Sequence, residues 1–351
     1  MTCIIDLFPE VSPVFFLSMV AMTGLLLTLV LGVPVIRWLK KKDYRDQIYK
    51  EYCEKLELLH KNKAQVPTGG GILLFTVLII SILVWFPWTR PLTWLFILLI
   101  TGYASLGWCD DRIKKKRQKG HGLKAKHKFI IQLCLATVTL LVLPYVYGST
   151  KPLFMLKVPF VEGMVSVHSS LGKLCCLGLA FLAIVGTSNA VNLTDGLDGL
   201  AAGTLFITTL GFVIVALNSP AIPIAREIAY MFAALAGVCM GFLWYNGPPA
   251  QVFMGDTGSL LLGGMLGSCA VMLRAELILI IIGSIFVAEA GSVILQVVSH
   301  KCWKKRIFLC SPLHHHYEYQ GMSEFKIVMR FWIVSLMCTG IGIAAALGRV
   351  L

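Results

Sequence analysis

Ten runs of apolar residues dominate this chain and leave few choices for its fold. Each run is close to the roughly 17 to 25 residues that an α-helix needs to cross a hydrocarbon layer of about 30 Å. A soluble domain of 351 residues could not bury this much apolar surface, since 57% of the residues are hydrophobic and only 14% are charged. We therefore predict an all-α integral membrane protein of a single domain, 1–351, with about ten transmembrane helices. The expected spans are residues 14–36, 70–86, 92–109, 129–147, 173–191, 200–217, 229–245, 258–273, 276–299 and 326–347.

The basic residues predict how these spans are oriented. Residues 37–66, 110–128 and 300–330 carry nine, nine and six Lys or Arg residues, together 24 of the 31 in the chain. With ten spans these three loops share one side, and the positive-inside rule makes that side cytoplasmic and both termini external. This topology explains the net charge of +13 better than nucleic-acid binding does, because the chain has no module with base-stacking aromatic residues. On the outer side, the alternating apolar residues of 148–171 predict a small hairpin.

Polar motifs gather on the predicted cytoplasmic side. The cytoplasmic loops are expected at approximately residues 37–69, 110–128, 190–199, 246–257 and 300–325. One of them contains Asn192, Asp195 and Asp198, which are three residues apart and would project from one side of a helical turn. Carboxylates at the end of a membrane span are costly and usually functional. We therefore expect the active face of the protein to be cytoplasmic.

Two further motifs carry carboxylates. Asp110 and Asp111 follow an apolar span and precede a run of basic residues, an arrangement that suits either a metal and phosphate site or a solvated helix end. Asp256 lies in a glycine-rich loop before the next span. Near a helix N-terminus, free N–H groups and the helix dipole attract phosphate and stabilise a carboxylate, although Asp256 could equally be an ordinary helix cap.

The string of His314, His315 and His316 allows three interpretations. Adjacent histidines on one helical turn rarely all bind one metal, which makes a zinc site the weaker interpretation. Histidines that bind phosphate or orient a substrate fit the charged surroundings better. A solvated loop is the third possibility.

The metal best suited to these motifs is magnesium. The aspartates come without cysteine ligands, and Mg²⁺ typically binds through one or two carboxylates together with substrate phosphates. Lys63, Lys114, Lys124 and Lys126 could neutralise such phosphates. Positioning and charge neutralisation are most of what phosphoryl transfer requires, and the chain has no Walker-type loop that would indicate ATP hydrolysis.

Glu289 lies inside an expected span, seven residues before Gln296 and on the same helix face. A buried carboxylate could belong to a proton path. It could also make an interhelical hydrogen bond, which we favour.

Together these motifs resemble those of the phospho-N-acetylmuramoyl-pentapeptide transferases, within the polyprenyl-phosphate N-acetylhexosamine-1-phosphate transferases. The resemblance covers about residues 63–330, and the histidine string is specific to the first of these groups. It implies transfer of phospho-MurNAc-pentapeptide from UDP-MurNAc-pentapeptide to undecaprenyl phosphate in the bacterial cytoplasmic membrane. The products would be lipid I and UMP, and the reaction would need Mg²⁺ as cofactor. A homodimer is what the family suggests.

The resemblance also implies roles for individual residues. Asp256 resembles the magnesium ligand, and Asp110 and Asp111 resemble the pair beside the lipid phosphate. Asp110 would be the candidate base, but a phosphomonoester is already mostly ionised because its second pKa is about 6. A covalent aspartyl-phosphate route competes with direct attack. His314 is counted with the catalytic residues.

The remaining carried-over residues are expected to bind substrate. The family's nucleotide-binding residues are matched by Asn192, Asp195, Gly196, Leu197 and Asp198. Its uracil contacts are matched by Asn246 and Phe253, with Phe253 stacked on the base. Its basic residues around the phosphates are matched by Lys63, Lys114 and Lys126, and its loop facing the sugar and diphosphate is matched by His314, His315 and His316.

The chain departs from the family pattern in its first cytoplasmic loop. Residues 66–71 read Val-Pro-Thr-Gly-Gly-Gly where relatives usually have Thr-Pro-Thr-Met-Gly-Gly, which leaves the roles of His60 and Lys63 open. Two other functions also stay open at this point. One is transfer of GlcNAc-1-phosphate, against which the histidine string argues; the other is proton-coupled transport built around Glu289, which predicts more polar residues inside the spans.

Overall fold

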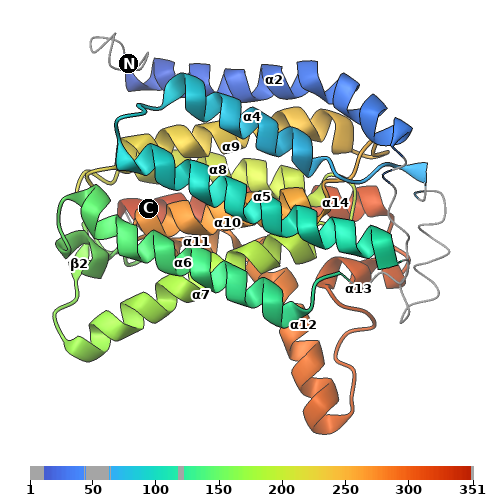
Figure 1. Cartoon of the computed structure of the whole chain (residues 1–351). Helices are drawn as coiled ribbons and strands as arrows, with labels where there is room; N and C mark the ends of the chain where they lie inside the picture. Colours follow the sequence, from blue (N-terminus) through green and yellow to red (C-terminus); the bar gives the residue numbers. More distant parts are fainter. Residues whose placement is uncertain (1–11, 43, 45–62, 64, 118–121, 349–351) are drawn as a thin grey trace.

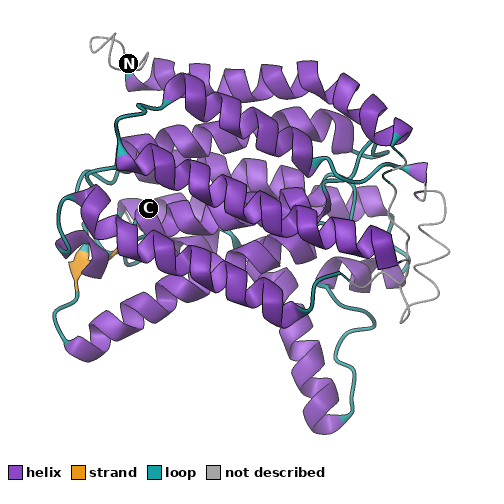
Figure 2. Ribbon diagram, in the orientation of Figure 1, coloured by secondary structure: helices purple, strands orange, loops and turns teal. Residues whose placement is uncertain are grey.

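The computed structural model describes residues 12–42, 44, 63, 65–117 and 122–348, and in this part of the chain it is a bundle of α-helices with one small hairpin (Figures 1 and 2). The helices are α2 (Pro13–Lys41), α4 (Gly71–Trp85), α5 (Pro91–Arg117), α6 (Ala125–Tyr147), α7 (Ser170–Thr194), α8 (Leu200–Leu217), α9 (Ala225–Asn246), α10 (Gly255–Met272), α11 (Glu276–Ile282), α12 (Ser284–Trp303), α13 (Leu313–Tyr319) and α14 (Glu324–Leu347). A short 3-10 helix, η2 (Lys151–Phe154), precedes the antiparallel strands β1 (Met155–Leu156) and β2 (Val165–Ser166).

Eight of the described helices are long and apolar enough to cross a membrane: α2, α5, α6, α7, α8, α9, α12 and α14. The prediction of an all-α integral membrane protein is thus confirmed. Helix α4 is apolar but shorter, with 15 residues. The number of ten spans and their orientation stay predictions.

The expected span 276–299 is wrong as a single helix. The helix α11 ends at Ile282, and α12 begins at Ser284, so that Gly283 lies between two helical segments. Glycine has low helix propensity because it loses the most backbone freedom on folding, which explains why the break falls here. Beyond it, α12 leaves the bundle at an angle and its end protrudes (Figure 1).

Helix α10 is the centre of the bundle. Every residue from Asp256 to Met272 is buried, and α10 packs against α4, α5 and α7. At 1.5 Å per residue its 18 residues extend about 27 Å, close to the thickness of the hydrocarbon layer. Because α10 is enclosed on all sides, the residues at its N-terminus are held in place by the surrounding helices.

The hairpin caps one end of the bundle, and the polar motifs lie at the other. The expected hairpin within 148–171 is confirmed, with Met155 opposite Ser166. It is tied to the helices by hydrogen bonds from the Lys157 N–H to the Arg274 carbonyl, just after α10, and from the Phe160 N–H to Ala345 in α14. The N-terminus of α10, with Asp256, therefore lies at the end far from the hairpin (Figure 1).

Candidate active site

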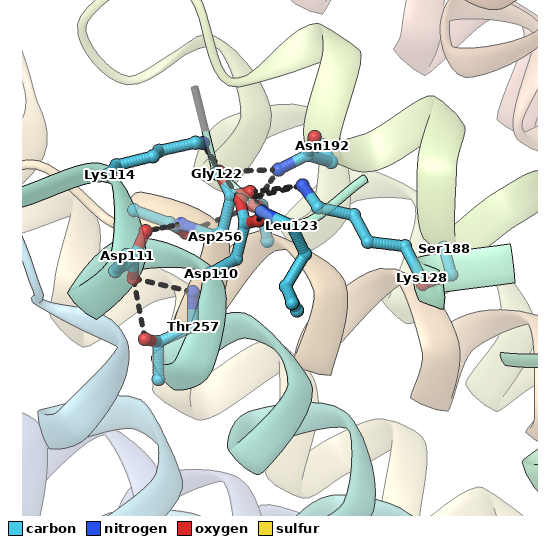
Figure 3. A network of polar contacts seen from close by, with 12 residues as sticks. Asp110, Asp111, Lys114, Gly122, Leu123, Lys128, Ser188, Asn192, Asp256 and Thr257 are labelled. Carbon is cyan, nitrogen blue, oxygen red and sulfur yellow. Dashed lines mark hydrogen bonds and ion pairs between the residues drawn. The ribbon is translucent and has the colours of Figure 1, made fainter. Parts of the chain in front are cut away.

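Four helix ends meet around the N-terminus of α10 (Figure 3). They are the last turns of α5, the first turn of α6, the last turns of α7 and the start of α10 itself. The polar side chains that they bring together are Asp110, Asp111, Lys114, Lys128, Asn192, Asp256 and Thr257. These residues are up to 147 positions apart in sequence, so only the packing of the helices joins them.

Asp111 caps α10 from a neighbouring helix. Its Oδ1 accepts the Asp256 N–H at 3.0 Å, and its Oδ2 accepts the Thr257 N–H at 3.0 Å and the Thr257 hydroxyl at 2.6 Å. A carboxylate here satisfies free N–H groups and opposes the positive end of the helix dipole. Asn192 fixes the Asp256 side chain by donating to its Oδ1 at 3.1 Å and to Ser259 Oγ at 2.8 Å.

Two lysines bridge the carboxylates of Asp110 and Asp256. The Nζ of Lys128 lies 2.6 Å from Asp110 Oδ2 and 2.8 Å from Asp256 Oδ2. The Nζ of Lys114 lies 3.1 Å from Asp110 Oδ2 and 2.9 Å from Asp256 Oδ1. The other oxygen of Asp110 accepts the Leu123 N–H at 2.5 Å. The buried carboxylates are therefore balanced by two ammonium groups.

Close backbone contact brings α5 to this site. A Cβ on Gly107 would lie 2.2 Å from the carbonyl oxygen of Asp256, and one on Gly71 would lie 2.2 Å from the Gly258 nitrogen. Both contacts are far shorter than real Cβ atoms make, so α4, α5 and α10 approach as they do only because these residues are glycines. Small residues at helix contacts are typical of membrane proteins.

Asp198 organises a second cluster beside the first. Its Oδ1 pairs with Lys63 Nζ at 2.6 Å, and its Oδ2 accepts the Ala250 N–H at 3.0 Å. Glu324, at the start of α14, pairs with the same ammonium at 2.5 Å and accepts the Asp198 N–H at 2.7 Å. Leu197 is buried in a small apolar cluster with α8, α12 and α14. Lys63 thus joins the segment before α4 to α14 and the 195–199 loop.

Asp195 and Gly196 line the space between these clusters. Desolvation raises the pKa of the half-buried Asp195 carboxyl well above its usual range, and the negative charges of Asp256 and Asp111 add to the rise. Among the described residues, no side chain is recorded as a hydrogen-bond or ion-pair partner of this carboxylate. Gly196 packs against the His314 ring, since a Cβ there would lie 2.2 Å from His314 Nε2.

Of the predicted uracil contacts, Asn246 ends α9 and Phe253 lies on the loop between α9 and α10. Asn246 is 3% exposed, and both polar atoms of its amide bond backbone groups. Its Nδ2 donates to the Val252 carbonyl at 3.0 Å, while its Oδ1 accepts the Gly199 N–H at 3.1 Å. Asn246 therefore shapes the two loops here. Phe253 is half-buried, and its N–H donates to the Pro67 carbonyl at 2.9 Å.

The histidine string lies within the short helix α13, and His314 and His315 are buried, so the solvated-loop interpretation is wrong. His314 and Glu289 are both fully buried: the His314 N–H donates to Glu289 Oε1 at 3.2 Å, and its Nδ1 lies 3.1 Å from Oε2. The Nδ1 of His315 contacts Glu318 Oε2 at 2.5 Å. His316 accepts a backbone N–H from the loop before α13. The favoured interpretation of Glu289, a hydrogen bond between helices, is confirmed.

Several residues of the site were not singled out in the sequence. Lys128 contacts the carboxylates, whereas Lys126 is exposed. Glu324 and the contact between Glu289 and His314 were also missed. Spacing alone gives no signal for these pairs, because each joins separate helices. His60 lies outside the described residues.

The oxygen atoms at the start of α10 can serve a hard cation. Asp256 and Asp110 present neighbouring carboxylates that share two ammonium groups. Within the described parts of the chain, no three or more His, Cys, Asp and Glu side chains form a group able to hold a metal. A cation here would therefore bind through one or two carboxylates and complete its shell with other oxygen ligands, which is the usual mode of Mg²⁺.

Comparison with known proteins gives the family. Residues 93–274, about half of the chain, match the family model of glycosyl transferase family 4. A phospho-N-acetylmuramoyl-pentapeptide-transferase of Chlamydia pneumoniae is 68% identical over 346 residues, which cover 99% of each chain. Proteins of the same name are 56% identical in Chlamydia abortus, over 96% of this chain and 97% of that one, and 53% identical in Chlamydia trachomatis, over 92% and 95%.

The matched stretch contains Asp110, Asp111, Asn192 and Asp256, and the full-length relatives extend the match through α13 and α14. The chain belongs to glycosyl transferase family 4, among the phospho-N-acetylmuramoyl-pentapeptide-transferases.

Proposed function

We propose that this protein transfers phospho-MurNAc-pentapeptide from UDP-MurNAc-pentapeptide to undecaprenyl phosphate, giving lipid I and UMP. Its relatives are named phospho-N-acetylmuramoyl-pentapeptide-transferases, and this chain matches them over nearly their whole length. The observation in the molecule that supports it best is the cluster of Asp110, Asp256, Lys114 and Lys128 at the end of a membrane bundle. Such a cluster can bind a cation and a diphosphate where a lipid phosphate can reach them.

In this reaction an oxygen of the lipid phosphate forms a bond to the β-phosphorus of the nucleotide sugar. The bond between that phosphorus and the bridging oxygen breaks, and UMP leaves with the electron pair. Lys114 and Lys128 neutralise the phosphate oxygens on which charge collects, which is the largest contribution that a protein makes to phosphoryl transfer. Asp110 would accept a proton from a lipid phosphate that arrives monoprotonated. Its role as a base is small because most of that phosphate is already ionised.

The oxygen donors fit magnesium, with Asp256 as the main ligand and Asp110 beside it. When bound, Mg²⁺ would neutralise charge on the diphosphate and hold it in place. Asp111 acts through the backbone, since its three hydrogen bonds hold the first turn of α10 and thereby the Asp256 carboxylate. Asn192 orients that carboxylate from the other side.

The nucleotide half would bind along the Asp195–Asp198 turn and the loop between α9 and α10. The half-buried Phe253 would stack on uracil, and Asn246 holds the two loops together through Gly199 and Val252. The buried pair of His314 and Glu289 sets the histidine ring against Gly196. His315 and His316 would extend the surface formed by His314 and Gly196 toward the sugar and diphosphate.

We place the enzyme in the bacterial cytoplasmic membrane, with this site facing the cytoplasm, because the basic loops predict that orientation and the nucleotide sugar is soluble. A homodimer is a further part of the proposal.

The test is release of UMP by purified protein in detergent, with undecaprenyl phosphate and UDP-MurNAc-pentapeptide, with and without Mg²⁺. We expect release to depend on lipid and on magnesium and to be lost in Asp256→Ala. Glu162→Ala, which removes a carboxylate at the hairpin end of the bundle, is the matched control and should behave as wild type. Release that survives without Asp256 would move the metal to another carboxylate.

The same assay separates the alternatives. Turnover of UDP-GlcNAc and not of UDP-MurNAc-pentapeptide would identify a GlcNAc-1-phosphate transferase. Uptake of substrate into proteoliposomes without UMP release would favour a transporter. The contact of Glu289 with His314 speaks against the transporter, because it assigns this buried carboxylate to the wall of the site.

A further inference from the structure

Lys128 occupies a position that a cation at Asp256 would need. Its ammonium contacts Oδ2 of both Asp110 and Asp256. The other oxygen of Asp256 is held by Asn192 and Lys114. Departure of Lys128 would therefore remove a positive charge from Oδ2 of Asp256 and leave the contacts of Asn192 and Lys114 with Oδ1 in place.

Charge favours such a departure. In the free protein, the ammonium groups of Lys114 and Lys128 contact the carboxylates of Asp110 and Asp256, and Asp111 adds a third carboxylate beside them. A divalent cation entering at Asp256 would add two positive charges within a few ångströms of both lysines, in a partly buried place where repulsion is only weakly screened. A cation therefore binds better once one of the two ammonium groups has moved away.

Of the two lysines, Lys128 is the better placed to move. Lys114 lies on the same helix as Asp110, four residues further along, and keeps a partner one turn away. Lys128 reaches the carboxylates from the start of a different helix, α6, by a long and flexible side chain. The side chains of Lys114 and Lys128 are 24% and 18% exposed, so the choice between them rests on their helices and not on exposure.

We propose that Lys128 is a substrate-positioning residue that exchanges partners: it neutralises Asp110 and Asp256 in the free protein and binds diphosphate oxygens once a divalent cation has replaced it. This inference rests on the proposed function. Because cation and diphosphate each favour the state in which Lys128 has left the carboxylates, each should strengthen binding of the other by the same factor. Binding of the cation alone should be weak.

The experiment measures binding and not turnover. Mn²⁺ serves as the probe for the magnesium site and UDP as the diphosphate, on the purified full chain in detergent. Bound Mn²⁺ is followed by electron paramagnetic resonance with and without UDP, and titrations without protein correct for the complex of Mn²⁺ with UDP. In the wild type we expect UDP to tighten Mn²⁺ binding on the order of tenfold or more, a usual size for coupling between sites.

The decisive variant is Lys128→Met, which keeps most of the length of the side chain and removes its charge. We expect Mn²⁺ binding without UDP to tighten about tenfold, and UDP binding at saturating Mn²⁺ to weaken by a similar factor. The coupling between the two ligands should shrink accordingly. Lys128→Arg keeps the charge and should bind Mn²⁺ as weakly as the wild type when UDP is absent.

Lys326→Met is the matched control. It removes one lysine charge from the start of α14, where the side chain is exposed, and should change neither affinity. The thermal unfolding midpoint of each variant, in the same detergent, shows whether it is folded.

Unchanged or weaker Mn²⁺ binding in folded Lys128→Met, with coupling as in the wild type, would refute the exchange and leave Lys128 as a structural counter-ion. A folded wild type that binds neither Mn²⁺ nor UDP would overturn the proposed function together with this inference. The two failures are thus distinguishable.

Discussion

Replacing Gly107 by alanine should remove most of the activity by displacing Asp256. A Cβ on Gly107 would lie 2.2 Å from the carbonyl oxygen of Asp256, 2.4 Å from its carbonyl carbon and 2.5 Å from the Thr257 Cα. All three atoms belong to the backbone of α10, which has no rotamer to relieve the overlap. Since ordinary contacts begin near 3.4 Å, α5 and α10 would have to separate by about 1 Å.

The magnitude follows from this shift. Overpacking of this kind costs about 1–3 kcal/mol of stability. A displacement of about 1 Å at reacting groups lowers the rate by roughly a hundredfold. Because Asp256 is the first buried residue of α10 and takes its position from that backbone, we expect kcat to fall by about two orders of magnitude. The decrease in unfolding temperature should be modest.

The assay is UMP release at saturating substrates, together with thermal unfolding in detergent. Gly340→Ala is the control, because a Cβ on this glycine of α14 meets no atom within 4 Å. That variant should keep wild-type activity. A folded Gly107→Ala protein with kcat near that of the wild type would show that the contact between α5 and α10 does not set the position of Asp256.

Three further substitutions test other contacts of the site. Asp111→Asn replaces one of the two carboxylate oxygens that cap α10 by an amide donor, and it loses a charge-assisted hydrogen bond worth about 1.5–3 kcal/mol. We therefore expect weaker Mn²⁺ binding, measured by electron paramagnetic resonance. Unchanged binding would contradict the capping role. Glu289→Gln removes the carboxylate beside His314, so kcat should fall about tenfold or more with little change in KM, whereas a change in KM alone would point to a binding role. Asn246→Ala leaves two buried backbone groups without partners at about 1–3 kcal/mol each; we expect a lower unfolding midpoint and a higher KM for the nucleotide sugar, and a wild-type midpoint would refute this account.

Much of the fold could be predicted from local patterns. Hydrophobic runs of membrane length predict helices because a backbone in lipid must satisfy its own hydrogen bonds. Nine of the ten expected spans therefore fall on single helices, although α5 continues eight residues beyond the expected end at residue 109. The tenth fails at Gly283, where a glycine ends α11 although the surrounding residues are apolar throughout. Hydropathy indicates whether a segment prefers lipid or water, and it does not show where a helix within that segment is interrupted.

The types of residue in the site could also be read from the sequence. Carboxylates, amides and histidines at the ends of apolar spans are costly unless they bind something, which identified Asp110, Asp256 and His314 as candidates. The different contacts that each of these residues makes could not be predicted in this way. Asp110 and Asp111 are adjacent, yet Asp110 binds the two lysines while Asp111 caps α10.

By itself, then, the sequence determined that the chain is a bundle of membrane helices with a polar, basic face, because burial and periodicity act over a few neighbouring residues. Only the tertiary structure decided which groups meet. The contact of Lys128 with Asp256 joins residues 128 positions apart, and that of His314 with Glu289 joins separate helices. Such contacts depend on how closely helices pack, which glycines such as Gly107 permit and no local pattern encodes.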